Sequence, residues 1–191
     1  MRCFVAIDLP DGVRAALDAT EARLRAAAPR ADVRWVGSQS MHLTLEFLGE
    51  VPEERGAAVQ RAIDRVASPT PPLRLVCAGL GVFPGPSRPR VVWAGIQDGV
   101  RELGMLAVAV ERALEPLGFP LERRPFRGHV TLGRVRSPRG FAPLARALDK
   151  GGRSGFGEWT ASQVVLYRSH LRPTGSVYEP LATLALAGDV A

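Results

Sequence analysis

Metal-binding and strongly nucleophilic side chains are scarce in this sequence, which has two cysteines, three histidines and a single lysine, Lys150. A structural zinc site needs about four closely spaced Cys or His ligands, and no such set is present. The glycine motifs of Rossmann and P-loop proteins are absent, and no apolar run is long enough to span a bilayer. These absences argue against zinc-finger, dinucleotide-binding, P-loop and transmembrane-helix classes.

The scarcity of lysine also limits what the charge implies. Of 25 basic residues all but Lys150 are arginine, and the formal net charge is +6. A positive charge suits a polyanionic partner such as nucleic acid. The same arginine content, together with 20 glycines and 16 prolines, also fits a genome-wide compositional bias. The charge alone therefore does not identify a nucleic-acid-binding protein.

The two cysteines lie in apolar stretches, at Cys3 and Cys77. This placement predicts buried free thiols, although a disulfide between them stays open. The apolar stretch within residues 1–8 is too short for a signal peptide and is soon followed by a charged residue. We predict that it forms a strand. We therefore expect a cytoplasmic protein that does not associate with membranes.

The length of 191 residues fits a single domain, 1–191, made of two lobes. Periodicity and breaker residues indicate strands and helices that mix without a regular βαβ repeat. The expected strands are 2–8, 33–36, 42–49, 73–78, 91–96, 129–135, 158–168 and 177–187. The expected helices are 10–28, 52–67, 100–117 and 141–150. A glycine- and proline-rich loop is expected at 79–90, and Arg172–Gly175 separates the last two strands.

One stretch, residues 41–49, combines strand alternation with chemically useful side chains. One face of this strand is apolar and holds Leu43, Leu45 and Phe47. The other face is polar and holds His42, Thr44 and Glu46. The apolar face can line a core while the polar face presents an imidazole and a hydroxyl one pleat apart.

The same His-x-Thr-Leu pattern returns at residues 129–132, so two of the three histidines open such a motif. This repetition is too specific for chance. The motifs are separated by close to half the chain, which indicates an internal duplication. We predict an α+β fold with a pseudo-twofold arrangement. Two antiparallel sheets, each contributing one histidine strand, would face each other across a central cleft with helices outside.

A pair of histidines suits acid–base chemistry at phosphorus. Imidazole titrates near neutrality, so one ring can act as a base while the other acts as an acid. The hydroxyls of Thr44 and Thr131 can donate hydrogen bonds to phosphate oxygens. A strained cyclic phosphodiester would need no metal ion for this reaction.

A metal site is the alternative, because His42, His129 and Glu46 resemble a two-histidine, one-carboxylate ligand set. However, four residues of strand separate His42 from Glu46 by roughly 13 Å, which is too far for one ion unless the strand breaks. Strand histidines satisfied by the neighbouring backbone are the other alternative.

The two motifs resemble those of the two-histidine (2H) phosphoesterase superfamily. Within it the chain is similar to the RNA 2′,3′-cyclic phosphodiesterases, also called 2′-5′ RNA ligase-like proteins. The likeness runs nearly the full length. Besides the motifs it includes Arg2-x-Phe4-x-Ala6, 33–36 (VRWV), Phe83-Pro84, 90–93 (RVVW) and 166–171 (LYRSHL). The resemblance implies a bilobal α+β fold and hydrolysis of an RNA terminal 2′,3′-cyclic phosphate to a 2′-phosphomonoester, with no cofactor.

The resemblance also implies residue roles. It makes His42 the proton donor and His129 the proton acceptor, although the near-equivalent motifs do not fix this order. Thr44 and Thr131 would bind the phosphate. Arg134 matches a basic position after the second motif, but its strand parity is opposite to that of His129, so it reaches the phosphate only if the strand bulges or ends.

Other residues are weaker candidates for the site. His170 is expected at the surface, and Phe4 and Tyr178 are expected to pack in the core rather than stack on a base. Four arginines flank the second motif and are candidates for RNA backbone contacts. They are Arg123, Arg124, Arg127 and Arg136.

The expected partner is an RNA end, and we expect a monomer. Three alternative functions stay open. They are the reverse reaction, which forms a 2′-5′ RNA linkage, hydrolysis of a small cyclic nucleotide, and RNA-end binding without catalysis.

Overall fold

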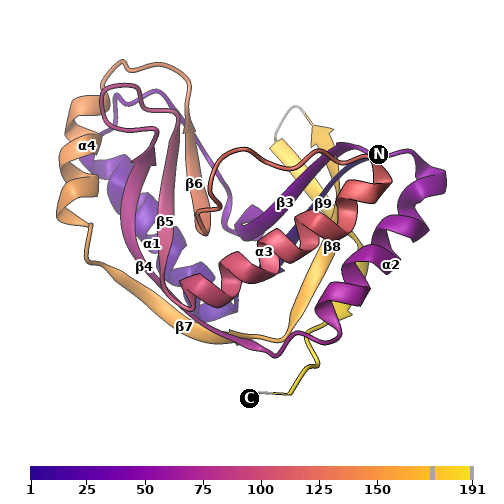
Figure 1. Ribbon diagram of the computed structural model, residues 1–191. Helices are drawn as coiled ribbons and strands as arrows, with labels where there is room; N and C mark the ends of the chain where they lie inside the picture. The colour runs from indigo at the N-terminus through magenta and orange to yellow at the C-terminus, as the bar shows by residue number, and fades with distance from the viewer. Residues whose placement is uncertain (173–174, 190–191) are drawn as a thin grey trace.

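The computed structural model describes residues 1–172 and 175–189, which form four α-helices and nine strands (Figure 1). The strands are β1 (Arg2–Asp8), β2 (Val33–Trp35), β3 (His42–Glu50), β4 (Leu73–Phe83), β5 (Val91–Asp98), β6 (His129–Val135), β7 (Gly155–Ala161), β8 (Gln163–Arg172) and β9 (Gly175–Ala185). The helices are α1 (Asp11–Ala27), α2 (Gly56–Ala67), α3 (Val100–Leu114) and α4 (Phe141–Lys150). The predicted α+β class is confirmed.

All strands belong to one antiparallel sheet, so the prediction of two separate sheets is wrong. The order is β7-β4-β5-β6-β3-β1-β8-β9, and β2 also pairs with β6. The sheet has two halves, β7-β4-β5-β6 and β3-β1-β8-β9, each built from strands of both halves of the chain. Strands β6 and β3 lie side by side and join these halves through Val130 and Leu43. This pairing satisfies part of two strand edges that would otherwise stay open.

Helices cover the sheet in two pairs (Figure 1). Helices α1 and α4 contact each other and pack on β7 and β4, whereas α2 and α3 contact each other and pack on β9 and β3. Each helix buries one apolar stripe; in α1 this stripe includes Val13, Leu17 and Leu24. Leu43 and Val130 are fully buried on the core side of the sheet. The alternating side chains of their strands are left for the opposite face.

Strand β4 runs on through Phe83, so the loop predicted at 79–90 is wrong in its first half. Gly81 lies beneath the indole ring of Trp93, and a Cβ at this position would lie 2.2 Å from a ring carbon. The glycine is therefore required by a close approach within the sheet and not by a turn.

The closing region contains three strands, β7, β8 and β9, rather than the two that were predicted. Strand β7 begins at Gly155, and its two glycines weaken the strand pattern in the sequence. Residues 173 and 174, which belong to the predicted break between the last strands, lie outside the described residues.

Strand β3 does not keep strict alternation along its length. In its pairing with β1 the register shifts twice, which leaves Leu45 and Leu48 as extra residues. Such bulges reverse the face of every following side chain. Leu48 is buried in place of Phe47, which is 65% exposed. The prediction that Phe47 faces the core with Leu43 is therefore wrong.

Cys3 and Cys77 are buried free thiols, as predicted. Within residues 1–172 and 175–189, no helix is both long and apolar enough to cross a membrane.

Candidate active site

The two His-x-Thr motifs lie side by side where the halves of the sheet meet. Strands β3 and β6 are antiparallel, and the central residues of the two motifs, Leu43 and Val130, form the register pair. In antiparallel pairing, the histidine of each motif then lies next to the threonine of the other. We define the first half-site as His42 with Thr44 and the second half-site as His129 with Thr131.

This pairing creates a pseudo-twofold centre. Because Leu43 and Val130 point into the core, the four side chains of the half-sites are directed to the open face. In regular antiparallel pairing, Cβ atoms placed diagonally across two strands lie about 7–8 Å apart. The histidines occupy such a diagonal across the pair formed by Leu43 and Val130.

Each imidazole is oriented by the same kind of hydrogen bond. Nδ1 of His42 lies 2.9 Å from the carbonyl oxygen of Ser40, and Nδ1 of His129 lies 2.7 Å from that of Arg127. A carbonyl oxygen only accepts, so Nδ1 carries a proton in both rings. In the neutral ring the lone pair is therefore on Nε2, and this is the atom available to a substrate.

The segment before His42 is itself fixed by an arginine. Arg14 of α1 donates to the carbonyl oxygens of Ser38 and Met41, at 2.8 and 3.1 Å. These bonds hold the short turn that carries the Ser40 carbonyl. The orientation of His42 is thereby tied to the first helix.

Aromatic rings enclose the first histidine. His42 stacks on Phe4 with ring centroids 4.7 Å apart, and Tyr178 meets it edge-on at 5.1 Å. Phe4 in turn stacks on Tyr167. Asp8 is the cross-strand partner of His42, and its carboxylate accepts a 2.7 Å hydrogen bond from the Tyr167 hydroxyl. The first half-site therefore has a fixed carboxylate beside its histidine.

The second histidine has a simpler environment. His129 meets Phe83 edge-on at 5.1 Å, and Phe83 stacks on Trp93 at 4.9 Å. Its cross-strand partner is Gly95, where a Cβ would lie 3.2 Å from the Trp93 ring. The cross-strand partner of the first histidine is thus an aspartate, whereas that of the second is a glycine without a side chain.

Burial lowers the pKa of both imidazoles, to about 4 for His42. The backbone hydrogen bond of each ring acts in the opposite direction, as does the Asp8 carboxylate beside His42. The guanidinium of Arg134 lowers both pKa values further. Both rings are therefore neutral at pH 7 before an anion binds.

Arg134 lies on the same face as the second half-site because β6 contains a bulge. Between Thr131 and Gly133 the register with β5 shifts by one residue, which leaves Leu132 as the extra residue. The shift reverses the parity of Arg134. Its side chain then lines the same pocket as Thr131.

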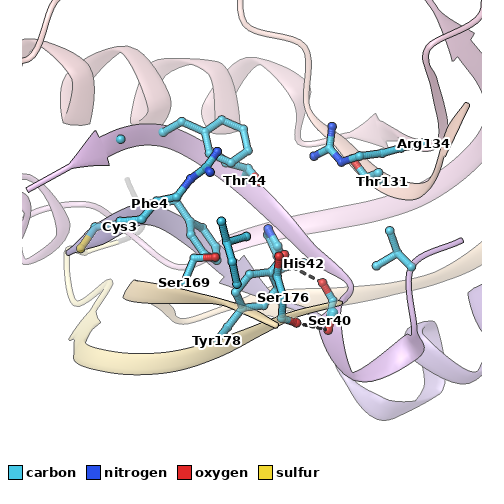
Figure 2. A pocket seen from close by; sticks show the side chains of 15 residues that line it. Cys3, Phe4, Ser40, His42, Thr44, Thr131, Arg134, Ser169, Ser176 and Tyr178 are labelled. Atoms are coloured by element: carbon cyan, nitrogen blue, oxygen red, sulfur yellow. Dashed lines mark hydrogen bonds between the residues drawn. The ribbon is translucent and has the colours of Figure 1, made fainter. Parts of the chain in front are cut away.

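A pocket of about 470 Å³ opens at this junction (Figure 2). Four of the five predicted site residues line it: His42, Thr44, Thr131 and Arg134. In Figure 2, Thr131 and Arg134 approach the pocket from the side opposite Phe4. His129 is not part of this lining, although it lies one pleat from Thr131 on the same strand.

Several pocket residues were not predicted as site residues. The hydroxyl groups of Ser169 and Ser176 face it, and so does the ring of Phe47, which the bulge in β3 turns outward. Asp8 was also missed as a neighbour of His42. A carboxylate that ends an otherwise apolar strand is a usable signal, but its partner depends on a register that alternation alone does not give.

Glu46 does not join the histidines, so the predicted common face for Glu46 and His42 is wrong. The bulge at Leu45 turns Glu46 away from the pocket. Burial and the nearby carboxylates of Glu111 and Glu122 raise its pKa to about 7. In the described part of the chain, no three His, Cys, Asp or Glu side chains gather in a way that could hold a metal ion.

The remaining candidates lie at the surface or beside the pocket. His170 pairs with Glu179 at 2.7 Å at the surface, as predicted. Phe4 is only 3% exposed, but it lines the pocket and stacks on His42. Tyr178 is half-buried at the pocket. The arginines that flank the second motif are exposed at the surface, and Arg124 among them pairs with Glu122. They are Arg123, Arg124, Arg127 and Arg136.

The LigT-like phosphoesterase family matches the chain twice in succession, at residues 7–93 and 95–178, and each match contains one half-site. The chain belongs to this family. The predicted superfamily is thereby confirmed, and the two successive matches support the predicted duplication within this LigT-like phosphoesterase.

Relatives of this LigT-like phosphoesterase match along nearly the full length. The RNA 2′,3′-cyclic phosphodiesterase of Archaeoglobus fulgidus is 35% identical over 95% of the chain and 98% of its own length. The crystal structure of a Thermus thermophilus protein, 34% identical, gives a TM-score of 0.83 over all of both chains. The structure of E. coli LigT complexed with 3′-AMP, 29% identical, gives 0.74 over 97% of each chain.

Proposed function

We propose that the protein is an RNA 2′,3′-cyclic phosphodiesterase that hydrolyses the terminal cyclic phosphate to a 2′-phosphomonoester by acid–base catalysis, without a metal ion. One observation carries the proposal. The pairing of Leu43 with Val130 brings two oriented imidazoles and two threonines to the same open face beside a pocket. Membership of the family and the names of its relatives support the class of substrate.

In the proposed reaction, Nε2 of His129 takes a proton from water as the water oxygen bonds to phosphorus. The bond from phosphorus to the 3′-oxygen breaks on the opposite side. Nε2 of His42 donates a proton to that leaving oxygen, and the phosphate stays on the 2′-oxygen. Thr44, Thr131 and Arg134 bind the non-bridging oxygens, whose charge shifts in the transition state.

The general acid must first acquire its proton, because both rings are neutral in the unbound protein. A phosphate anion placed between the rings raises the pKa of both histidines. Asp8 adds a second negative charge beside His42, and Gly95 adds none beside His129. This difference supports His42 as the acid and His129 as the base. In this proposal the bound phosphate completes the catalyst, because it raises the pKa of His42 and the ring then takes up a proton from solvent.

The test is turnover of an oligoribonucleotide that ends in a 2′,3′-cyclic phosphate, with the product followed by phosphorus NMR. We expect a 2′-phosphomonoester, and we expect the rate to survive excess EDTA. A 3′-phosphate product, or EDTA-sensitive activity that zinc restores, would contradict the proposal. Adding an RNA with a 5′-hydroxyl to the same reaction measures the reverse direction, because the same two histidines would catalyse formation of a 2′-5′ linkage.

A further inference from the structure

A minority of the arginines in residues 1–172 and 175–189 are neutralised by carboxylates. Arg74 pairs with both Asp98 and Glu158, and Arg168 pairs with Glu53. Three arginines that face the open side of the sheet have no such partner among the described residues: Arg2 and Arg134, which line the pocket, and Arg34 beside Arg134. An uncompensated guanidinium beside a phosphate pocket is a natural contact for a further anion.

Arg34 lies on the same face of the sheet as Arg134. The two residues are direct cross-strand partners in the pairing of β2 with β6. Their neighbours confirm the orientation, because Trp35 points to the helix side, where Arg25 of α1 lies 5.7 Å from its ring centroid. By alternation, Arg34 then points to the open side. It is exposed, and it stands one strand, about 4.8 Å, further from the histidines than Arg134.

The side chain of Arg34 extends toward the other half of the molecule. Its Nη2 lies 3.6 Å from the point where a Cβ would stand on Gly175, the first residue of β9. The next residue, Ser176, lines the pocket. The guanidinium of Arg34 is therefore at the rim where the two halves approach each other. The nearby carboxylate of Asp32 is already an acceptor for the Ser137 hydroxyl, at 2.9 Å.

Two like charges placed directly opposite each other destabilise an antiparallel pair. An anion bound beside them offsets this cost, and phosphate oxygens fit the donor fork of a guanidinium. A chain end whose cyclic phosphate lies between the histidines has its next phosphate on the 5′-oxygen of the same nucleoside.

We propose that Arg34 binds this 5′-phosphate, so that the enzyme selects substrates carrying phosphate on both sides of the terminal nucleoside. The inference rests on the proposed function. It assigns Arg134 to the reacting phosphate and Arg34 to the adjacent one. Two kinds of substrate share this chemistry: an RNA chain, in which the second phosphate is a diester, and a single nucleotide that carries a 5′-phosphomonoester.

The test compares kcat/KM for three substrates: a nucleoside 2′,3′-cyclic phosphate, the same compound with a 5′-phosphate, and a dinucleotide ending in the cyclic phosphate. The wild-type enzyme should prefer one or both of the substrates with a second phosphate. In Arg34→Gln this preference over the nucleoside 2′,3′-cyclic phosphate should fall by about tenfold. Such a loss corresponds to one charge-assisted hydrogen bond. The salt dependence of kcat/KM on the dinucleotide should also weaken.

Arg61→Gln is the matched control, because Arg61 is exposed on α2 and forms no ion pair among the described residues. It should leave all three values unchanged. Comparing the dinucleotide with the 5′-phosphorylated nucleoside shows whether the site accepts a phosphodiester, a phosphomonoester or both. An equal loss on all three substrates in Arg34→Gln, or no wild-type preference, would overturn the inference while leaving the hydrolysis intact. If the wild-type enzyme hydrolyses none of the three, the proposed function itself fails.

Discussion

His42 stacks on one aromatic ring, meets a second edge-on and faces a carboxylate across the strand, whereas His129 meets a single ring edge-on and faces a glycine. Yet both rings hold the carbonyl oxygen two residues before them through Nδ1. The repeated motif therefore gives the two half-sites the same ring orientation. The strands next to the motif make them different.

This contrast separates two tasks of the structure. Orientation comes from the His-x-Thr strand and its preceding residue, so it is duplicated with the motif. Proton affinity depends on burial and neighbouring charge, which come from β1 beside the first motif and β5 beside the second. A duplicated strand can thus acquire complementary roles without any change in the motif. The predictions below test whether the half-sites are as different chemically as their surroundings are.

The largest expected effect comes from removing either imidazole. In His42→Ala and in His129→Ala, kcat for the cyclic phosphate should fall by about 10³-fold, because each removes a proton transfer from the transition state. Single-turnover rates at saturating substrate measure this loss. The double variant should cost little more than either single variant, since the two groups act as a unit.

A change of leaving group then separates the two roles. When sulfur replaces the 3′-oxygen of the cyclic phosphate, the leaving thiolate needs no proton. His42→Ala should regain most of its activity on this substrate, and His129→Ala should not. The reverse pattern would exchange the proposed roles, and equal rescue of both variants would remove the distinction between the half-sites.

Acid should destabilise the folded protein through the first half-site. Burial depresses the pKa of His42 from 6.5 to about 4. Between these values the unfolded chain binds a proton that the folded chain does not, so the free energy of unfolding falls as pH drops through this window. The loss amounts to about 3 kcal/mol at 1.4 kcal/mol per pH unit.

Urea unfolding at several pH values measures this loss. In His42→Phe, which keeps a ring for the stack on Phe4, the stability should depend less on pH. Thr44→Val, beside it on the strand, should keep the wild-type dependence. If His42→Phe retains the full slope, the histidine is not as buried in solution as the structure indicates.

The sequence patterns predicted much of the first half-site and missed the bulges that complete the pocket. His42, Thr44, Leu43 and Val130 follow simple alternation, so their faces were predicted correctly. Beyond Thr44 the prediction failed for Phe47, because the extra residue in β3 is set by the pairing with β1. A register shift depends on contacts between segments far apart in the chain, and periodicity within one segment does not contain it.

The joining of the two halves was missed for a similar reason. The sequence indicates two similar strands, but the single register pair between Leu43 and Val130 makes them neighbours rather than opposite walls. Arg134 shows the opposite case. Simple alternation would place its side chain on the face opposite to His129. We predicted that Arg134 reaches the site only if the strand bulges, and β6 has such a bulge at Leu132.

The two threonines offer a smaller test of symmetry. Thr44→Val and Thr131→Val remove one hydroxyl donor each while keeping the β-branched shape, and each should lower kcat/KM by about tenfold. Similar losses would indicate that the half-sites bind the phosphate alike. A loss confined to one variant would show that the phosphate lies off the pseudo-twofold axis. Thr183→Val, at an exposed position of β9, is the control and should have no effect.

The smallest expected effect concerns the carboxylate that distinguishes the half-sites. Asp8→Asn removes the negative charge that raises the pKa of His42. A general acid works only while protonated, so the alkaline limb of the profile of kcat against pH should move to lower pH, with about a threefold loss above the optimum.

Tyr167→Phe is the matched control, since it deletes the hydroxyl that donates to Asp8 but keeps the charge and the ring that stacks on Phe4. Its alkaline limb should stay close to that of the wild type. If Asp8→Asn moves the acidic limb instead, His42 is the base. If neither limb moves, the carboxylate does not determine which histidine carries the proton, and the difference must then come from the substrate, whose leaving oxygen would lie closer to one ring than to the other.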